Sequence, residues 1–151
     1  MKDIIKETED IEQQFRLQLW DNSGKEKYKS NALCKKTDCI IIVFDLTELK
    51  SFDSVENWRN NFLDKIEYPE NFPFILIGNK SDEVDKRKVS DEKIKEYCKS
   101  KSISAYFDTS AKNNINIKEV FEEATKLGYY RVRELQYELN IMNGKKTDSE
   151  S

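Results

Sequence analysis

The chain has 151 residues, of which 36% are charged and 37% hydrophobic, and its 26 basic and 29 acidic side chains give a net charge of −3. This length suits one domain with its own core. Charges of both signs are mixed along the chain, which argues against a nucleic-acid binder, because such proteins gather basic charge on one face. The three cysteines lack metal-ligand spacing and indicate reduced thiols in a cytosolic protein.

No part of the sequence predicts a membrane segment. The longest apolar run, residues 39–44, is far shorter than the ~20 apolar residues that cross a bilayer. Residues 1–10 alternate in charge and lack the apolar stretch of a signal peptide.

The first clear strand pattern covers residues 15–20, where every second residue is apolar. A period of two is typical of a strand buried on one face. Residues 4–5 predict the beginning of an earlier strand, and the polar residues 9–14 would connect the two.

Continuous apolar runs predict the interior of the sheet. Residues 39–44 and 74–78 are rich in β-branched side chains, as in parallel strands that are covered on both faces. Residues 105–108 predict a shorter strand after them.

Helical patterns alternate with these strands. Ser51 is expected to cap a helix with an apolar stripe, Ser90 a second helix, and Asn116 a third that continues to Met142. The polar residues 143–151 predict a disordered tail. Alternating strands and helices indicate an α/β fold with a parallel sheet and right-handed crossovers. The expected stripe of the first helix is Phe52, Val55, Trp58, Phe62 and Ile66.

A candidate base-binding motif follows the strand at residues 74–78, at the end where open α/β sheets bind ligands. It reads Asn79-Lys80-Ser81-Asp82. The Asp82 carboxylate can accept two hydrogen bonds from guanine, whereas adenine presents an acceptor at N1 and would be rejected. The Lys80 stem can lie along the base, and Asn79 can brace neighbouring loops. Taken alone, the motif is more often a polar turn.

A second motif, Thr109-Ser110-Ala111-Lys112, follows the next strand. A backbone N–H in this segment could bond guanine O6, and Lys112 could cover the other face of the base. Ser110 and Asn79 can also act as simple strand-end caps. The two motifs in this order indicate a guanine-binding site much more specifically than either motif alone.

The segment Trp20-Asp21-Asn22-Ser23-Gly24-Lys25-Glu26 resembles the Trp-Asp-Thr-Ala-Gly-Gln-Glu segment of Rab proteins, which are small GTPases of the Ras superfamily. Residues 43–47, 77–82 and 109–112, together with Ser51-Phe52 and Trp58, agree with this resemblance. Pro69-Glu70-Asn71-Phe72-Pro73-Phe74, with Tyr106-Phe107, looks most like the late-endosomal Rab subclass. The resemblance implies the Ras-like G domain, a P-loop NTPase fold of three layers with a mostly parallel sheet.

The resemblance also implies roles for this segment. Asp21 would face a Mg²⁺ ion bound with GTP or GDP, and the Gly24 N–H would contact the γ-phosphate. Lys25 stands where the family has the Gln that orients the attacking water. An ammonium group cannot accept a hydrogen bond, so no catalytic residue is assigned, and we expect GTP hydrolysis to be absent or very slow.

The family's phosphate-binding loop, Gly-x-x-x-x-Gly-Lys followed by Ser or Thr, does not occur among the four glycines. The resemblance therefore implies a domain without its first strand, P-loop and first helix, and weak or absent binding of Mg²⁺ and nucleotide. The missing strand would leave a gap between residues 15–20 and 39–44. We expect residues 15–20 to slide across and pair with residues 39–44.

These observations predict a truncated Rab-like domain over residues 1–142, acting as a GTP-binding protein of vesicle traffic with impaired nucleotide binding. The alternative is a non-catalytic pseudo-GTPase that binds Rab effectors or regulators through Trp20 and Tyr28. An unrelated flavodoxin-like module explains the strand and helix order but not the two guanine motifs. Rab proteins end in prenylated cysteines, and no cysteine follows Cys98. We therefore expect a cytoplasmic, aggregation-prone monomer that reaches endosomal membranes only through partners.

Overall fold

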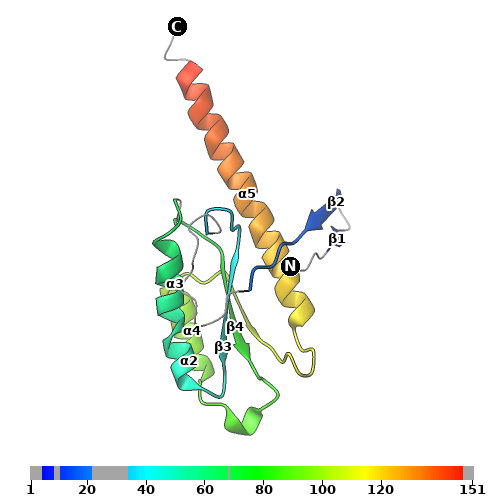
Figure 1. The fold of residues 1–151 in the computed structure, drawn as a ribbon, viewed down its shortest axis with the longest axis vertical. Helices are drawn as coiled ribbons and strands as arrows, with labels where there is room; N and C mark the ends of the chain where they lie inside the picture. Colours follow the sequence, from blue (N-terminus) through cyan, green and yellow to red (C-terminus); the bar gives the residue numbers. More distant parts are fainter. Residues whose placement is uncertain (1–4, 9–10, 22–33, 68, 148–151) are drawn as a thin grey trace.

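The computed structural model describes residues 5–8, 11–21, 34–67 and 69–147. Their strands form two sheets (Figure 1). A two-stranded antiparallel sheet contains β1 (Ile5–Thr8) and β2 (Ile11–Arg16). A parallel sheet in the order β3-β4-β5 contains β3 (Ile40–Asp45), β4 (Phe74–Asn79) and β5 (Ala105–Asp108).

Helices cover both faces of the parallel sheet, which gives three layers (Figure 1). Helices α2, α3 and α4 lie on one face, and the long helix α5 lies on the other. This arrangement confirms the predicted Ras-like α/β architecture with its parallel sheet. The helices are α2 (Leu49–Asp53), α3 (Val55–Leu63), the 3-10 turn η1 (Val84–Lys86), α4 (Asp91–Ser100) and α5 (Ile117–Thr147).

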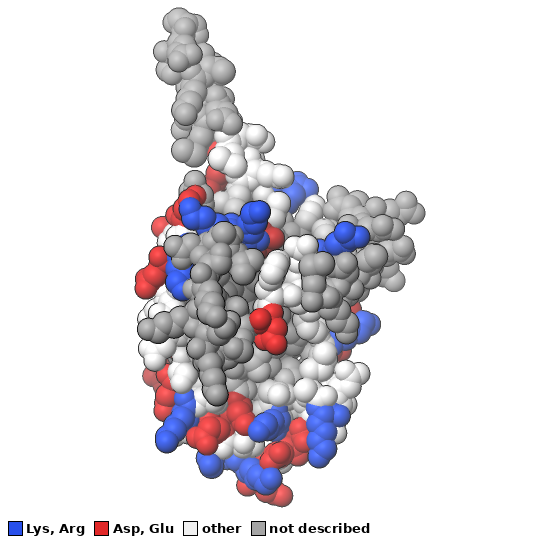
Figure 2. All heavy atoms as spheres, viewed as in Figure 1, with Lys and Arg blue, Asp and Glu red and all other residues white. Residues whose placement is uncertain are grey.

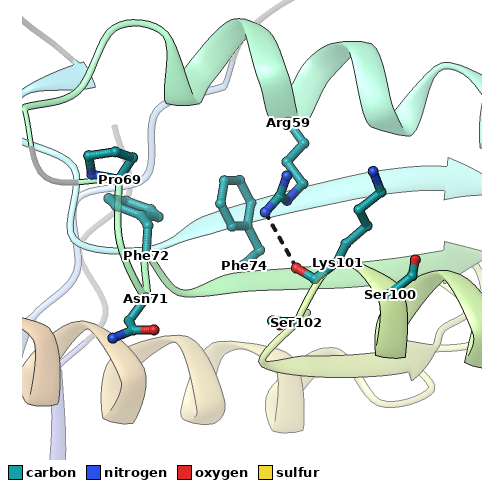
Figure 3. Close-up of a pocket in the computed structure, with 8 residues that line it drawn as sticks. All are labelled: Arg59, Pro69, Asn71, Phe72, Phe74, Ser100, Lys101 and Ser102. Atoms are coloured by element: carbon teal, nitrogen blue, oxygen red, sulfur yellow. Dashed lines mark hydrogen bonds between the residues drawn. The ribbon is translucent and has the colours of Figure 1, made fainter.

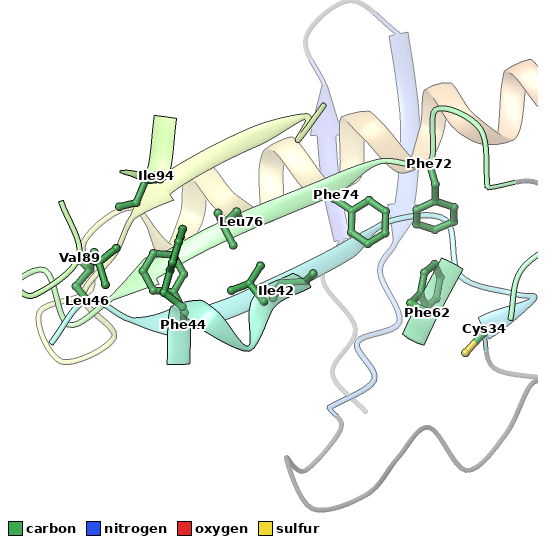
Figure 4. Packing of buried hydrophobic residues seen from close by; sticks show 12 residues of the cluster. Cys34, Ile42, Phe44, Leu46, Phe62, Phe72, Phe74, Leu76, Val89 and Ile94 are labelled. Carbon is green, nitrogen blue, oxygen red and sulfur yellow. The ribbon is translucent and has the colours of Figure 1, made fainter. Parts of the chain in front are cut away.

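The larger core lies between the sheet and helices α2 to α4 (Figure 4). A smaller cluster joins Ile75 and Ile77 of β4 to Val120 and Ala124 of α5. Strand β4 is therefore covered on both faces, as its apolar run predicts. The larger core includes Ile42, Phe44, Phe52, Val55, Phe62, Phe74, Leu76 and Ile94.

Strand β3 departs from the prediction that both of its faces are covered. Ile42 and Phe44 are buried, but Val43 on the opposite face is 59% exposed. Helix α5 packs over β4, and Ile41 at the near end of β3 is only partly buried beside it. Because β3 is an edge strand of the sheet that the described residues form, the cover that α5 provides ends before Val43.

The N-terminal strand prediction is wrong in its boundaries. The described ladder of β2 ends at Arg16, which lies opposite Ile5 of β1. Residues 17–20 belong to no strand, and their burial still alternates as the period of two predicts. On the buried side, the Phe15 ring lies 5.3 Å from the Tyr129 ring of α5 in an edge-to-face contact.

The predicted sliding of residues 15–20 onto β3 is also wrong. Strand β2 pairs with β1 in a separate sheet. A hairpin between neighbouring segments closes a very short loop, which costs less chain entropy than a distant pairing. Within the described residues, the second edge of β3 has no strand partner.

The first helix also begins elsewhere than expected. Helix α2 is capped by Glu48, whose side chain accepts from the Lys50 N–H, and it is separated from α3 at Ser54. The Ser51 hydroxyl instead accepts from the Asp45 N–H at 2.9 Å. The predicted cap at Ser90 is confirmed, since its side chain accepts from the Lys93 N–H.

Helix α5 begins directly after Asn116, as predicted. Asn116 has a φ of 56°, and its side-chain amide donates to the Asp108 carbonyl at 2.7 Å, which connects the start of α5 to β5. The predicted tail boundary at residue 143 falls inside α5, which runs to Thr147; residues 148–151 lie outside the described part. None of the described helices has the length and apolarity needed to cross a bilayer.

Candidate functional site

Two loops meet at the carboxyl end of the parallel sheet, the β4 loop (Asn79–Asp82) and the β5 loop (Thr109–Lys112). Gly78 of β4 stands opposite Asp108 of β5, so the two strands end at the same level. The Ser81 N–H donates to the Thr109 carbonyl at 2.9 Å, and the Thr109 N–H donates to the Gly78 carbonyl at 2.8 Å. The strands therefore bring together the two motifs that the sequence singled out.

Asn79 connects the two loops through its side chain. Its Oδ1 accepts from the Ala111 N–H at 3.1 Å and from the Thr109 hydroxyl at 3.3 Å. The amide oxygen is thus engaged twice, and the amide NH₂ supplies two further donors. Asn79 takes the bracing role that the sequence suggested.

Asp82 is held by Ser110 of the opposite loop. The Ser110 hydroxyl donates to Asp82 Oδ1 at 2.5 Å and accepts from the Asn113 N–H at 3.0 Å. The hydrogen bond from Ser110 lowers the pKa of Asp82, and the charges of Lys112 and Lys80 act in the same direction. A carboxylate has about four lone-pair positions, so Asp82 keeps acceptors for two more donors.

Lys80 is directed to the end of β3. Its φ is 66°, and its Nζ lies 2.6 Å from Asp45 Oδ2. Burial alone would raise the pKa of Asp45, but the hydrogen bonds from Lys80 and Thr47 lower it overall. The sequence analysis assigned Asp45 no role, although the carboxylate comes at the end of β3 directly opposite Asn79.

Arg87, which follows η1, forms a second connection that the sequence analysis missed. Its Nη1 donates to Asp108 Oδ2 at 2.7 Å, and its Nε donates to the Val89 carbonyl at 2.9 Å. The Tyr106 hydroxyl donates to the other oxygen of Asp108. Burial raises the pKa of Tyr106, and its bond to Asp108 adds to the effect. The segment after the β4 loop is thereby fixed to the last residue of β5.

Gly78 leaves the space in which this network fits. A Cβ at this position would come within 2.6 Å of the Tyr106 hydroxyl and 2.8 Å of a Leu46 methyl group. Such contacts are too close for a larger residue, so the glycine before the β4 loop is required by packing.

The remaining residues of the β5 loop are exposed. The Ala111 N–H already donates to Asn79, so a base oxygen would share this N–H or use that of Lys112. The loop is closed by a bridge between Ser110 and Ile115, and Asn114 takes a φ of 56°.

Of the residues expected to contact phosphate and metal, the structure describes Asp21 but not Gly24. Asp21 is exposed and forms no hydrogen bond or ion pair with either loop within the described residues. Gly24 and Lys25 lie outside the described part. No group of three potential metal ligands gathers among the described residues. One exposed carboxylate does not make a magnesium site, so no chemical step is assigned to a metal here.

The site is open to solvent, and charges of both signs surround it. Figure 2 shows lysines, arginines and acidic residues intermixed at the end of the molecule that contains η1. A small hollow of about 40 Å³ lies beside the β4 loop, lined in part by Lys80, Val84 and Arg87. A larger cavity lies at the opposite end of the sheet, beside the first residue of β4.

Comparisons with known proteins identify the family of the chain. The sequence profile described as "Ras family" matches residues 1–129. A "Ras-related protein Rab7" from Pisum sativum is 41% identical over 130 residues, which cover 82% of this chain and 63% of the relative. "Ras-related protein RABG3d" from Arabidopsis thaliana is 42% identical with the same coverage.

A third relative, "GTP-binding protein yptV5" from Volvox carteri, is 40% identical over 128 residues, which cover 82% of this chain and 62% of the relative. The chain spans less than two thirds of the length of these relatives. Their names confirm the predicted resemblance to Rab proteins, with Rab7 recurring among them. The chain belongs to the Ras family of small GTPases.

Proposed function

We propose that this chain is a Rab-like GTP-binding protein of vesicle traffic, in which the β4 and β5 loops bind guanine. One observation carries the proposal: Ser110 holds the Asp82 carboxylate in place while Asn79 holds the backbone of Ala111. Acceptors and donors for one base edge are thereby fixed relative to each other before any ligand binds.

The base contacts follow from these groups. Asp82 accepts from the adjacent N1–H and amino group of guanine, and a backbone N–H of the β5 loop donates to guanine O6. Lys80 and Lys112 cover the two faces of the ring. For Lys80 this requires leaving Asp45, to which it is bonded in this structure. Adenine would place an acceptor against Asp82, and such unpaired polar groups are costly.

We further propose that this polypeptide binds nucleotide weakly and does not hydrolyse GTP. The sequence has no Gly-x-x-x-x-Gly-Lys segment to hold phosphates, and Lys25 takes the place of the Gln that would orient water. Contacts with base and ribose alone correspond to a Kd near millimolar, or about 4 kcal/mol.

Calorimetric titration with GDP and ADP tests the assignment. The unmodified chain should prefer GDP, and Asp82→Asn should remove the preference, because an amide offers one acceptor where the base presents two donors. Asp85→Asn is the matched control, since Asp85 is an exposed acid in η1 and outside both loops. Equal binding of GDP and ADP by the unmodified chain would refute the role of Asp82.

A second candidate function is a non-catalytic module that binds Rab effectors or regulators. Trp20 favours it, because this large aromatic side chain is 60% exposed beside Asp21. Trp20→Ala should then weaken binding to the Rab-binding domain of a Rab7 effector protein without changing the preference for GDP over ADP. On either reading, the chain would act in the cytoplasm and at endosomal membranes.

A further inference from the structure

A cavity of about 410 Å³ lies at the end of the sheet opposite the β4 and β5 loops (Figure 3). Three segments surround it: helix α3, the loop that leads into β4, and the turn between α4 and β5. Its size lies within the roughly 300–1,000 Å³ of small-ligand pockets. Because it is remote from the candidate nucleotide loops, its function would be separate from theirs.

Arg59 of α3 is the residue of interest in this cavity. Its guanidinium carbon lies 5.2 Å from the centre of the Phe74 ring. Its Nη2 donates to the Lys101 carbonyl across a long 3.4 Å (Figure 3). Its Nε is buried and has no hydrogen-bond partner among the described residues. Buried donors are nearly always paired in native proteins, so Arg59 is incompletely satisfied, and a ligand in the cavity would meet its guanidinium at the Nη groups.

No carboxylate neutralises Arg59 within the described residues. The other cation of the cavity, Lys101, has its Nζ 2.7 Å from Glu56. Glu56 is occupied by three donors, since it also accepts from the Tyr97 hydroxyl at 2.8 Å and from the Asn60 amide at 3.3 Å. Glu70 is adjacent to the cavity in sequence, but its charge acts on Arg131. One positive charge therefore remains at the cavity wall.

We propose that this cavity binds a carboxylate, supplied by a glutamate or aspartate side chain of a partner protein. Stacking on Phe74 leaves the planar edge of the Arg59 guanidinium for a two-pronged bond to a carboxylate. Ser100 and Ser102 line the same space, although the Ser100 hydroxyl donates to the Tyr97 carbonyl. Phe72 offers an apolar surface to side-chain methylenes. A single unpaired cation matches a single carboxylate, and a free monocarboxylic acid is too small to fill the volume.

The Nε–H signal of Arg59 in a ¹⁵N NMR spectrum gives a direct readout, and its assignment follows from its loss in Arg59→Lys. The probe is acetyl-Gly-Glu-Glu-Gly-amide, and its neutral match is acetyl-Gly-Gln-Gln-Gly-amide. We expect a saturable shift of the Arg59 signal with the acidic peptide and none with the neutral one. Acetate and inorganic phosphate should bind at least about tenfold more weakly than the acidic peptide.

Variants separate the cavity from general attraction between charges. Arg59→Lys should lower the affinity for the acidic peptide at least about tenfold, since lysine cannot form the two-pronged bond. Arg133→Lys is the matched control, because Arg133 lies on α5 against Tyr129, and it should bind as the unmodified chain does. Ser100→Phe, which fills the cavity and keeps Arg59, should also abolish binding.

Several outcomes would overturn the proposal. The first is that the acidic peptide produces no saturable shift of the Arg59 signal. The second is that the acidic and neutral peptides produce equal shifts. The third is that Arg59→Lys and Arg133→Lys lose equal affinity for the acidic peptide. Acetate or phosphate binding as tightly as the acidic peptide would show a site for free anions and would refute a protein partner. The outcome of the GDP titration is independent of all of these.

Discussion

The Ser110 hydroxyl lies 2.5 Å from Asp82 Oδ1 and joins two loops that are 28 residues apart in the sequence. The bond has two effects. It fixes the direction of the Asp82 carboxylate, and it lowers the pKa of Asp82. Asp82 is therefore an ionised acceptor at neutral pH, which is the state that guanine recognition requires.

The first prediction concerns the titration of Asp82. Because its pKa in the folded chain is below the ordinary value of about 3.9, its bond to Ser110 stabilises the fold above that value, and the stabilisation is lost as the pH falls through the lowered pKa. Ser110→Ala should raise the pKa of Asp82. Carboxyl ¹³C NMR titration of the unmodified chain and of Ser110→Ala can measure this. An unchanged Asp82 midpoint would contradict the assigned cause.

The second prediction concerns Arg87, which connects the segment after the β4 loop to Asp108. Arg87→Met should lower the free energy of unfolding by about 1–2 kcal/mol, because it leaves the Asp108 carboxylate with one partner fewer. GDP affinity should fall with it, since the β5 loop begins beside Asp108. Urea unfolding and calorimetry measure the two effects.

Lys86→Met is the control for Arg87. Lys86 pairs with Glu83 at 2.7 Å, but its side chain is 72% exposed, and exposed pairs contribute at most about 1 kcal/mol. Similar losses of stability in the two variants would show that Arg87 is no more than a surface ion pair.

The third prediction contrasts two glycines. Gly78→Ala should destabilise the fold by about 1–3 kcal/mol, because the added methyl group meets Tyr106 and Leu46 at less than 3 Å. Gly128→Ala should stabilise it by about 0.5–1 kcal/mol, because Gly128 lies inside α5 and alanine is the better helix former. At Gly128 the new Cβ would find its nearest neighbour, the Asp38 Cβ, at an ordinary 3.4 Å. Urea unfolding should show opposite signs for the two changes.

The sequence predicted the parallel sheet well because its signal is local. Continuous β-branched runs marked β3 and β4 within a residue of their observed ends, and β5 matches residues 105–108. The two motifs could be placed side by side because parallel strands end at a common edge. That much of the candidate site follows from pattern and topology alone.

The rest depended on contacts between distant residues. The bonds of Lys80 to Asp45 and of Arg87 to Asp108 join side chains from different strands and loops. No periodicity marks such pairs in one sequence. The N-terminal strand was displaced for a similar reason, since the period of two describes burial without specifying a partner.

The last prediction concerns the free edge of β3. The Ile40 N–H donates to the Pro73 carbonyl and the Leu46 N–H donates to the Asn79 carbonyl, so both point to β4. Successive N–H groups of a strand point to opposite sides. The N–H groups of Ile42 and Phe44 therefore also face β4, whereas those of Ile41 and Val43 face away from it.

Hydrogen exchange followed by NMR should then alternate along β3. Ile42 and Phe44 should exchange slowly, and Ile41 and Val43 should exchange fast, because no strand of the described residues pairs with that edge. The Asp45 N–H faces the same edge but donates to the Ser51 hydroxyl at 2.9 Å, so Ser51→Ala should speed its exchange and leave Phe44 unchanged. Slow exchange at Ile41 and Val43 at every concentration would contradict an open edge. Protection that grows with concentration would show instead that a second copy pairs there, as exposed strand edges tend to do.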